Sequence, residues 1–287
     1  MSESLKAKTE EQVLDTIKWA VAEKKSLDVR GTGSKSKLGR PMEIDHILDL
    51  SALSGVKFYE PAELVLSAGA ATPVAEIEAL LNDQSQQIAF EPPDLGPLLG
   101  NRAGGGTLGG LLACNLAGSR RIKAGSARDH FLGFTAVSGR GEVFKSGGRV
   151  VKNVTGFDLS KLMAGSYGTL AVMTEVTVKV LPAPEKIRTV LINWERDGTY
   201  DHGGTKAMID ALASPHEVSG AAHLPAAVAG LSSVDYIASG GCAVTAIRVE
   251  GPEPSVAHRC EALRALFAPL GDTEELHSKN SQTLWRE

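Results

Sequence analysis

The stretch GGGTLGGLLACNLAGSRR, residues 104–121, places five glycines within seven positions and follows them with an apolar segment long enough for a helix. Residues 91–170 contain 17 of the 31 glycines of the chain. Glycine has no Cβ, so it allows tight turns and close approach of a ligand to the main chain. The pattern predicts a fold in which the backbone itself lines a binding site.

The composition argues against several classes of protein. The chain has 287 residues, 43% hydrophobic and 22% charged, with a net charge of −4, so it lacks the basic surface of a nucleic-acid-binding protein. It shows no signal-peptide pattern and no apolar run long enough for a transmembrane segment. Cys114, Cys242 and Cys260 form no CxxC pair, which argues against a metal or iron–sulfur site and favours a cytoplasmic protein.

Hydrophobic periodicity and capping residues predict the elements of the first part of the chain. Thr9 and Gln12 form a capping box before a helix expected at 9–25, and Thr72-Pro73 begins a second helix. The expected strands lie within 26–30, 46–53, 63–70, 86–90, 133–148 (a hairpin with its turn at 139–141) and 168–182.

Pro182 and Pro184 mark a boundary between a first domain at 1–185 and a second at 186–287. The second part alternates strands with helices, which predicts a smaller α+β domain. Its expected elements are strands at 188–194 and 241–250 and helices at 206–214 and 256–271. No final strand or closing helix is expected around the terminal HSKNSQTLWRE.

The first glycine loop reads Arg30-Gly31-Thr32-Gly33-Ser34-Lys35. Consecutive backbone N–H groups on such a turn form a concave anion site, and the hydroxyls of Thr32 and Ser34 add donors. An ordinary strand-to-loop turn has a similar composition, so this loop alone leaves both interpretations open.

The second loop contains the spacing GxGxxG at Gly104, Gly106 and Gly109. A Rossmann fold needs this motif directly after a hydrophobic strand, whereas FEPPDLGPLLGNRA precedes it here, and this context argues against that fold. A bare backbone followed by a helix at 108–118, with its N-terminal N–H groups facing an anion, is the remaining interpretation. Together the two loops predict a pyrophosphate held from two sides.

The order of these motifs resembles a known family. RGTGSK, then EPPD, GGGTLGG and GSARD, and finally KNVTGFDLSKLMAGSYGTLAVMTEVTVKVLP are similar to FAD-binding domains of the vanillyl-alcohol-oxidase type, also called the PCMH type. Within that superfamily the chain is most similar to the FAD-binding accessory (E) subunits of glycolate oxidase complexes. The resemblance covers residues 10–185 and implies an α+β fold, with two α+β subdomains that hold FAD and then a short or truncated α+β cap domain.

The resemblance also implies which residues bind the cofactor. Carried over by position, they are Arg30, Gly31, Thr32, Gly33, Ser34, Lys35, Gly106, Thr107, Leu108, Gly109, Gly110, Ala113, Asn115, Gly118, Gly125, Ser126, Arg128, Asp129, Gly168, Thr169 and Val172. Some relatives attach FAD covalently through a histidine or a cysteine. The first loop has no histidine and Cys114 is expected to be a buried apolar thiol, so non-covalent FAD is expected.

The catalytic residues are not identified by the sequence. No metal site is predicted, because the C-terminal histidines, at 202, 216, 223, 258 and 277, are dispersed and His130 is a single histidine nearer the expected flavin. Arg120 and Arg121 either pair with an anion or form a solvated helix end. The resemblance makes Lys152, Asn153 and Asp158 candidates for contacts near the flavin.

The resemblance implies an FAD-dependent oxidoreductase acting on CH–OH groups, as a subunit of a complex that oxidises glycolate or D-lactate to the 2-oxo acid. The implied partners are a catalytic flavoprotein and an iron–sulfur subunit, which would place the complex in the cytoplasm or at the inner face of the membrane. Nucleic acid is not an expected partner. Two alternatives stay open: a self-sufficient FAD-linked oxidoreductase acting on another alcohol or acid, and a non-catalytic subunit with a flavin fold.

Overall fold

The chain forms two compact units in the computed structural model, which describes residues 3–149, 156–194 and 200–287, with side chains of the last segment described from residue 203. Unit 1 comprises Met1–Ala117 and Gly125–Ala183, and unit 2 comprises Gly118–Ala124 and Pro184–Glu287. The segment 118–124 therefore belongs to a different unit from both of its flanks. Among the described helices, none is long and apolar enough to cross a membrane.

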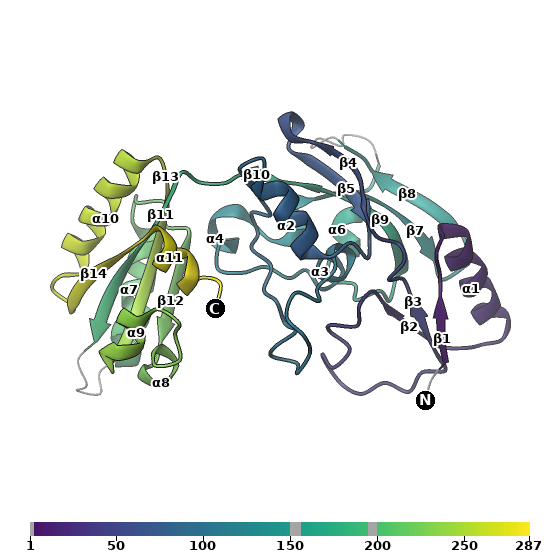
Figure 1. Ribbon diagram of the computed structural model, residues 1–287, viewed down its shortest axis with the longest axis horizontal. Coiled ribbons are helices and arrows are strands. Elements are labelled where there is room, and N and C mark those ends of the chain that lie inside the picture. The colour runs from purple at the N-terminus through teal and green to yellow at the C-terminus, as the bar shows by residue number, and fades with distance from the viewer. Residues whose placement is uncertain (1–2, 150–155, 195–199) are drawn as a thin grey trace. The chain divides into compact units, whose positions relative to one another are not determined.

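Unit 1 begins with a small parallel sheet. Its strands β1 (Glu3–Lys6), β2 (Leu27–Arg30) and β3 (His46–Asp49) lie in the order β1-β3-β2. The helix α1 (Glu10–Ala22) lies beside this sheet at the purple end of the ribbon in Figure 1. Thr9 caps α1 by accepting the N–H of Gln12, and the helix buries Val13, Ile17 and Ala20, which confirms the helix expected at 9–25.

A larger antiparallel sheet forms the centre of unit 1. It has the order β4-β5-β9-β7-β8. Its strands are β4 (Val56–Glu60), β5 (Val65–Gly69), β7 (Phe131–Ser138), β8 (Val143–Gly147) and β9 (Ala171–Lys179). The predicted hairpin is confirmed, because β7 and β8 pair antiparallel around the turn at 139–141.

The other helices of unit 1 cover one face of the large sheet, whereas α1 packs against Val137 and Val172 in a separate core. They are α2 (Val74–Asn82), α3 (Leu108–Cys114), α5 (Ala127–His130) and α6 (Leu159–Met163), with a 3-10 turn η1 (Pro61–Glu63) and a short pair β6 (Gln86–Gln87) and β10 (Leu181–Pro182). Ile77 and Leu81 of α2 and Leu112 of α3 are buried in one core with strand residues such as Val176. The predicted α+β class, with two subdomains in this part of the chain, is confirmed.

Unit 2 is a four-stranded antiparallel sheet in the order β12-β13-β11-β14, with helices on both faces. Its strands are β11 (Lys186–Trp194), β12 (Gly220–Leu224), β13 (Ala243–Gly251) and β14 (Asp272–His277). Its helices are α4 (Arg121–Ala124), α7 (Tyr200–Ala213), α8 (Ala226–Ala229), α9 (Asp235–Gly240), α10 (Glu253–Phe267) and α11 (Ser278–Leu284). The spacing of Val256, Cys260, Leu263 and Phe267 places these side chains in the core under α10.

The expectation that no final strand or closing helix follows α10 was wrong. β14 pairs with β11 from Arg188↔His277 to Asn193↔Asp272, and α11 follows it directly. β14 reads DTEELH, and only Leu276 of its six residues is buried. An edge strand that buries one side chain gives almost no apolar alternation, which is the signal that sequence patterns depend on.

Two consecutive glycines allow α7 to pack directly on the aromatic side chains of the sheet. A Cβ on Gly203 would lie 2.5 Å from the Trp194 ring, and one on Gly204 would lie 2.3 Å from His223 Nδ1. The same His223 atom is 2.8 Å from Thr245 Oγ1, so the ring is held in place. A helix that carried side chains here could not come this close.

We predict that Gly204→Ala destabilises unit 2 by about 1–3 kcal/mol, although alanine is the better helix former, because the methyl group overpacks a fixed ring. Chemical unfolding followed by tryptophan fluorescence measures the change. Gly230→Ala is the matched control, because Gly230 has an ordinary helical φ of −64° and a Cβ there would lie 3.4 Å from its nearest neighbour. Equal effects of the two substitutions would contradict the packing account.

Candidate functional site

Unit 1 contains a cleft of about 280 Å³ in which three distant parts of the sequence meet. The first wall is the end of β2 with the first glycine loop, residues 28–36. The second wall is formed by Thr107, Gly109 and Gly110 together with Ala113 and Cys114 of α3. The third wall is the segment 167–173, where the chain enters β9.

Direct hydrogen bonds hold the two glycine loops together. The hydroxyl of Thr32 donates to the carbonyl oxygen of Gly105, and Asn101 Nδ2 donates to the carbonyl oxygen of Ser34 at 2.9 Å. The second loop is also braced from outside, because Asp94 Oδ2 accepts the N–H of Gly104 at 2.7 Å. The cleft therefore has a floor of two fixed backbone segments.

The loops meet so closely that side chains on the glycines would fill the space. A Cβ on Gly31 would lie 3.0 Å from Thr107 Oγ1, and one on Gly110 would lie 2.9 Å from the same atom and 3.3 Å from Lys35 Nζ. A Cβ on Gly109 would lie 2.7 Å from both the Cβ and the carbonyl oxygen of Ala70. The missing side chains thus serve loop packing as well as access to the cleft.

The expectation that the N-terminus of the second-loop helix faces an anion was wrong. The helix is shorter than expected, since α3 ends at Cys114 and Asn115 caps it in the left-handed region with a φ of 52°. The N–H of Leu108 donates to Thr72 O at 2.9 Å, and that of Gly109 donates to Ala70 O at 2.7 Å. The N–H of Gly110 donates to Thr107 Oγ1, the N-cap of the helix. These three N–H groups are therefore used by the N-cap and by the turn between β5 and α2.

The first loop keeps its backbone donors available. Within the described part of the chain, the N–H groups of Thr32, Gly33, Ser34 and Lys35 have no hydrogen-bond acceptor. Gly33 has a φ of +75°, which turns successive N–H groups toward one concave side, as in backbone anion sites. The first loop, rather than the helix of the second, offers the anion-binding surface.

Lys35 brings a positive charge into the cleft. Burial lowers the pKa of Lys35, and the nearby Cys114 and Asp94 offset part of this effect. Arg30 is less available to a ligand, because its Nε donates to Asp28 Oδ2 at 2.7 Å. Lys35 is half-buried, and its Nζ donates to Ser34 Oγ at 3.3 Å. A partly desolvated ammonium group favours an anionic ligand that restores the interactions it has lost with water.

The structure brings 13 of the predicted cofactor residues to the cleft wall, namely Arg30, Gly31, Thr32, Gly33, Ser34, Lys35, Thr107, Gly109, Gly110, Ala113, Gly168, Thr169 and Val172. The others lie outside the lining, namely Gly106, Leu108, Asn115, Gly118, Gly125, Ser126, Arg128 and Asp129. Leu108 is in the core. Asn115 and Asp129 act on the backbone instead: Asn115 Oδ1 accepts the N–H of Arg128, and Asp129 Oδ2 accepts that of Ser126.

Other predicted residues have different surroundings. Lys152 and Asn153 lie outside the described residues, and Asp158 forms an ion pair with Lys161 at 3.8 Å. The interpretation of Arg120 as part of a solvated helix end was wrong, because Arg120 is buried and donates to Glu250. His130 is fully buried and its Nδ1 is 3.3 Å from the carbonyl oxygen of Lys179.

Sequence reasoning missed several residues that build the cleft. Asp94 and Asn101 brace the loops, and Tyr167 lines the wall with its backbone N–H bonded to Ala113 O at 2.9 Å. Asp94 and Asn101 form hydrogen bonds with main-chain atoms of residues distant in the sequence, and no local sequence pattern reveals such bonds. Asp28 could have been found, because residues i and i+2 of a strand share a face and Asp28 precedes Arg30 by two.

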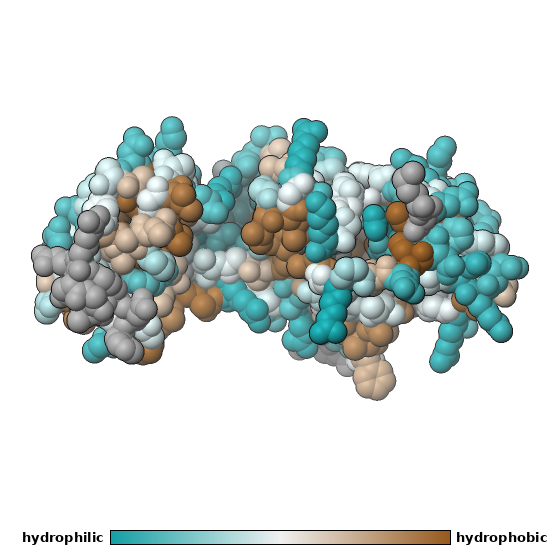
Figure 2. Space-filling model, turned by 90° about the horizontal axis from the view of Figure 1, so that it is seen from below, coloured by the Kyte–Doolittle hydropathy of each residue, from teal (hydrophilic) through white to brown (hydrophobic). Residues whose placement is uncertain are grey.

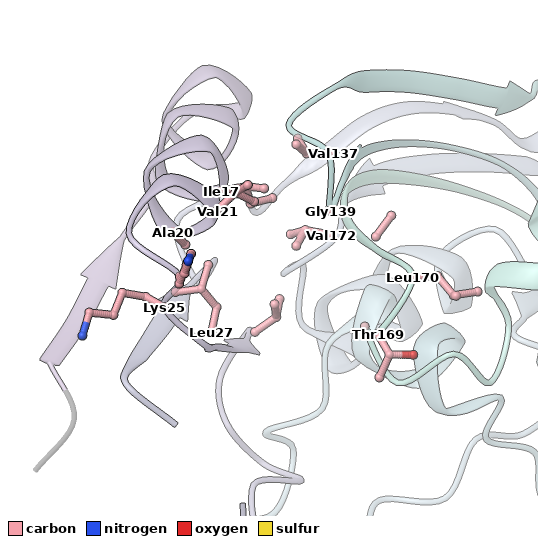
Figure 3. A pocket seen from close by; sticks show the side chains of 14 residues that line it. Ile17, Ala20, Val21, Lys25, Leu27, Val137, Gly139, Thr169, Leu170 and Val172 are labelled. Carbon is pink, nitrogen blue, oxygen red and sulfur yellow. The ribbon is translucent and has the colours of Figure 1, made fainter. Parts of the chain in front are cut away.

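A second cavity of about 310 Å³ adjoins the cleft. Figure 3 shows Ile17 and Val21 of α1 facing Val137 and Val172 of the large sheet across it. Both cavities share a wall formed by Val29, Gly168, Thr169, Ala171 and Val172. An open apolar groove therefore adjoins the glycine-lined cleft.

Comparison with known proteins identifies the fold and the cofactor of the family to which the chain belongs. A family described as FAD binding domain matches residues 4–147, which include both glycine loops. The chain belongs to this family. It is the FAD-binding domain family of the PCMH or vanillyl-alcohol-oxidase type that the motif order predicted.

Curated relatives of this FAD-binding chain are oxidoreductases. Glycolate oxidase subunit GlcE of Escherichia coli strain K12 is 43% identical over 172 residues, 60% of this chain and 47% of that protein. D-lactate dehydrogenase of Anaerostipes hadrus is 40% identical over 120 residues, 40% of this chain and 24% of that protein. The aligned regions thus span less than half of either relative.

Solved structures share the fold over almost the whole chain. An alkyldihydroxyacetonephosphate synthase matches with a TM-score of 0.73 at 16% identity, covering 98% of this chain and 54% of the other. A p-cresol methylhydroxylase matches with a TM-score of 0.71 at 15% identity, covering 99% and 61%. At such low identity the likeness concerns the fold alone.

The residues of the cleft fit the FAD that the family binds. A diphosphate needs close backbone approach, oriented N–H donors and a compensating cation. Close backbone approach is possible at Gly31 and Gly110, which have no side chains. The donors are the N–H groups of residues 32–35, and the cation is the ammonium of Lys35. The adjoining apolar groove suits a flat ring system.

We predict that Lys35→Met weakens FAD binding by about tenfold to a hundredfold, because a charged hydrogen bond to an anion is lost. The same change raises the melting temperature of the FAD-free protein, because folding no longer buries an ammonium whose pKa is lowered. Titration of the apoprotein with FAD, followed by flavin fluorescence, and thermal unfolding measure the two effects.

The sign of the pH dependence follows from the lowered pKa of Lys35. An anionic ligand favours the charged amine, so FAD affinity falls as pH rises through the lowered pKa, below the ordinary value of 10.5. Lys37→Met is the matched control, because Lys37 is exposed and does not line the cleft. An equal loss of affinity in both variants would assign the effect to overall charge.

Proposed function

We propose that this chain is the FAD-binding part of a glycolate oxidase-type complex that oxidises a small 2-hydroxy acid to the 2-oxo acid. The observation that carries the proposal is the meeting of the two glycine loops on one cleft, joined by Thr32 and Gly105, in a chain 43% identical to a glycolate oxidase subunit over 172 residues. Relatedness to D-lactate dehydrogenases supports 2-hydroxy acids as the substrate class.

In this proposal each wall of the cleft contacts a different part of FAD. The first loop binds the diphosphate through its N–H groups and Lys35, and Thr107, Gly109 and Gly110 form the opposite side. Gly168, Thr169 and Val172 border the adenine end, next to the apolar groove. When bound, FAD supplies the two-electron acceptor for oxidation of the alcohol.

The cleft favours non-covalent binding. Among the residues that line it in the described part of the chain there is no histidine, and Cys114 is the lining thiol. Burial raises the pKa of Cys114, and the charge of Lys35 offsets part of this effect. A protonated thiol is a weak nucleophile, so Cys114 is not suited to form a bond to the flavin.

The proposed partners are a catalytic flavoprotein and an iron–sulfur subunit that accepts the electrons. The face shown in Figure 2 carries hydrophobic patches among hydrophilic side chains. Large apolar side chains such as Phe157 in unit 1 and Leu231 in unit 2 are 89% and 84% exposed. Exposed apolar side chains of this size are compatible with contacts to other subunits.

We predict that the chain purified from a flavin-sufficient host shows a flavin absorbance spectrum and releases the flavin into the supernatant on acid precipitation. The chain alone turns glycolate and D-lactate over slowly or not at all, and its partner subunits restore the rate. Flavin retained in the pellet would contradict non-covalent binding. Rapid turnover by the chain alone would replace the subunit role with that of a self-sufficient oxidoreductase.

A further inference from the structure

The turn at residues 166–169 places a tyrosine side chain in the wall of the cleft. Tyr167 lies just before β9 and lines the cleft together with Gly168 and Thr169. Among the described residues that line the cleft, Tyr167 is the only aromatic one. The proposed function gives its ring no role, so we asked what the ring does there.

The backbone of this turn has a conformation that disfavours tyrosine. The N–H of Thr169 donates to the carbonyl oxygen of Ser166 at 3.0 Å, which closes the turn. Its two central residues, Tyr167 and Gly168, have φ values of 54° and 76°. Turns with two positive φ values favour Asn-Gly, Asp-Gly or Gly-Gly, because most side chains are strained in the left-handed region. Tyr167 therefore occupies a position that its own backbone preference opposes.

Contacts within unit 1 hold the turn in this conformation. The N–H of Tyr167 donates to the carbonyl oxygen of Ala113 at 2.9 Å, and Thr169 Oγ1 donates to that of Ser166 at 2.7 Å. A Cβ on Gly168 would lie 3.9 Å from the Cβ of Val29 on β2. Contacts with both other walls of the cleft thus fix the position of Tyr167.

The Tyr167 side chain contributes little to the packing of the ligand-free protein. Tyr167 is 60% exposed and belongs to none of the hydrophobic core clusters of the described residues. An aromatic side chain stabilises a fold mainly through the area that it buries. A strained residue that packs so little is typical of ligand sites, where the strain holds a side chain in the position that binding needs.

The ligand assigned to the cleft has a flat ring at this end. In the proposed function Gly168 and Thr169 border the adenine end of FAD, and Tyr167 directly precedes them. Nucleobases stack on aromatic side chains, because both have flat apolar faces. An adenine ring against Tyr167 would cover the exposed face of the tyrosine, which explains why an aromatic residue stands where asparagine or glycine is favoured.

We propose that Tyr167 stacks on the adenine ring of FAD and makes binding in the cleft depend on the adenosine half of the cofactor. This inference rests on the proposed function, because it concerns the cleft assigned to FAD. The strained turn holds the ring in the wall before the cofactor binds. Replacement of Tyr167 therefore has two effects of opposite sign: it relieves backbone strain and it removes the stacking contact.

The first test is Tyr167→Asn, because asparagine tolerates the left-handed region better than other residues that have a Cβ. We expect the melting temperature of the FAD-free protein to rise by about 1–3 °C, while FAD affinity falls about tenfold. Unchanged FAD affinity would overturn the inference. Loss of both stability and affinity would assign Tyr167 a structural role and would also overturn it.

Tyr167→Phe keeps the ring and removes only the hydroxyl. Stacking depends on the ring, so we expect FAD affinity within twofold of the wild type and an unchanged melting temperature. Titration of each apoprotein with FAD, followed by flavin fluorescence, measures the affinities. A loss of affinity in Tyr167→Phe as large as in Tyr167→Asn would show that the hydroxyl binds the cofactor, which contradicts stacking.

Ser85→Asn is the matched control for relief of backbone strain. Ser85 also has a positive φ, of 52°, but it is exposed and does not line the cleft. We expect its melting temperature to change as little as that of Tyr167→Asn and its FAD affinity to stay within twofold of the wild type. An equal loss of FAD affinity in the two asparagine variants would overturn the inference.

Competition by ADP tests which half of FAD the ring contacts, because ADP carries the adenine and the diphosphate without the flavin. We expect ADP to displace FAD from the wild type and to bind Tyr167→Asn about tenfold more weakly. ADP that does not compete, or that binds both proteins equally, would overturn the adenine contact. Failure of the wild type to bind FAD would contradict the proposed function, whereas normal FAD binding with either ADP result would contradict only the role of Tyr167.

Discussion

The hydrogen bond from the Thr32 hydroxyl to the Gly105 carbonyl oxygen joins two glycine loops that are 73 residues apart in the sequence. The cleft exists only because these loops meet, and they meet only because the contacting positions lack side chains. Gly31 and Gly110 both approach Thr107 at distances that a Cβ would occupy. Asp94 and Asn101 hold the loops from outside, so the bare backbone is supported by side chains that do not line the cleft.

The electrostatics of the cleft complement this geometry. The guanidinium of Arg30 is paired with Asp28, which leaves Lys35 as the cation with most to gain from an anionic ligand. The protein places this ammonium where burial lowers its pKa, at a cost to the stability of the ligand-free state. Such a cost is typical of groups positioned for binding.

The sequence was sufficient to predict the elements with strong periodicity and the two loops. Thr9 and the spacing of Val13 and Ile17 determine α1 locally, so its prediction was confirmed. β14 and α11 were missed because they bury few side chains and their place depends on β11, which is distant in the sequence. Local patterns report burial, and these elements have little of it.

The site was predictable only in part for a similar reason. Glycine loops are visible in a sequence, but the partners of their backbone groups are not. The N–H groups of Leu108 and Gly109 looked available for an anion until the structure paired them with Thr72 and Ala70. Arg120 looked like a helix-end residue because its partner Glu250 lies 130 positions away.

Hydrogen–deuterium exchange of the apoprotein with and without FAD tests the central claim most directly, because it reports on backbone N–H groups segment by segment. The account predicts slower exchange in the FAD complex across 31–36 and 165–172, while the β11–β13 sheet of unit 2 is unchanged. The largest protection belongs to 32–35, whose N–H groups are free to bind the diphosphate. Saturating FAD that leaves 32–35 unprotected, or that protects mainly the sheet of unit 2, would contradict the account.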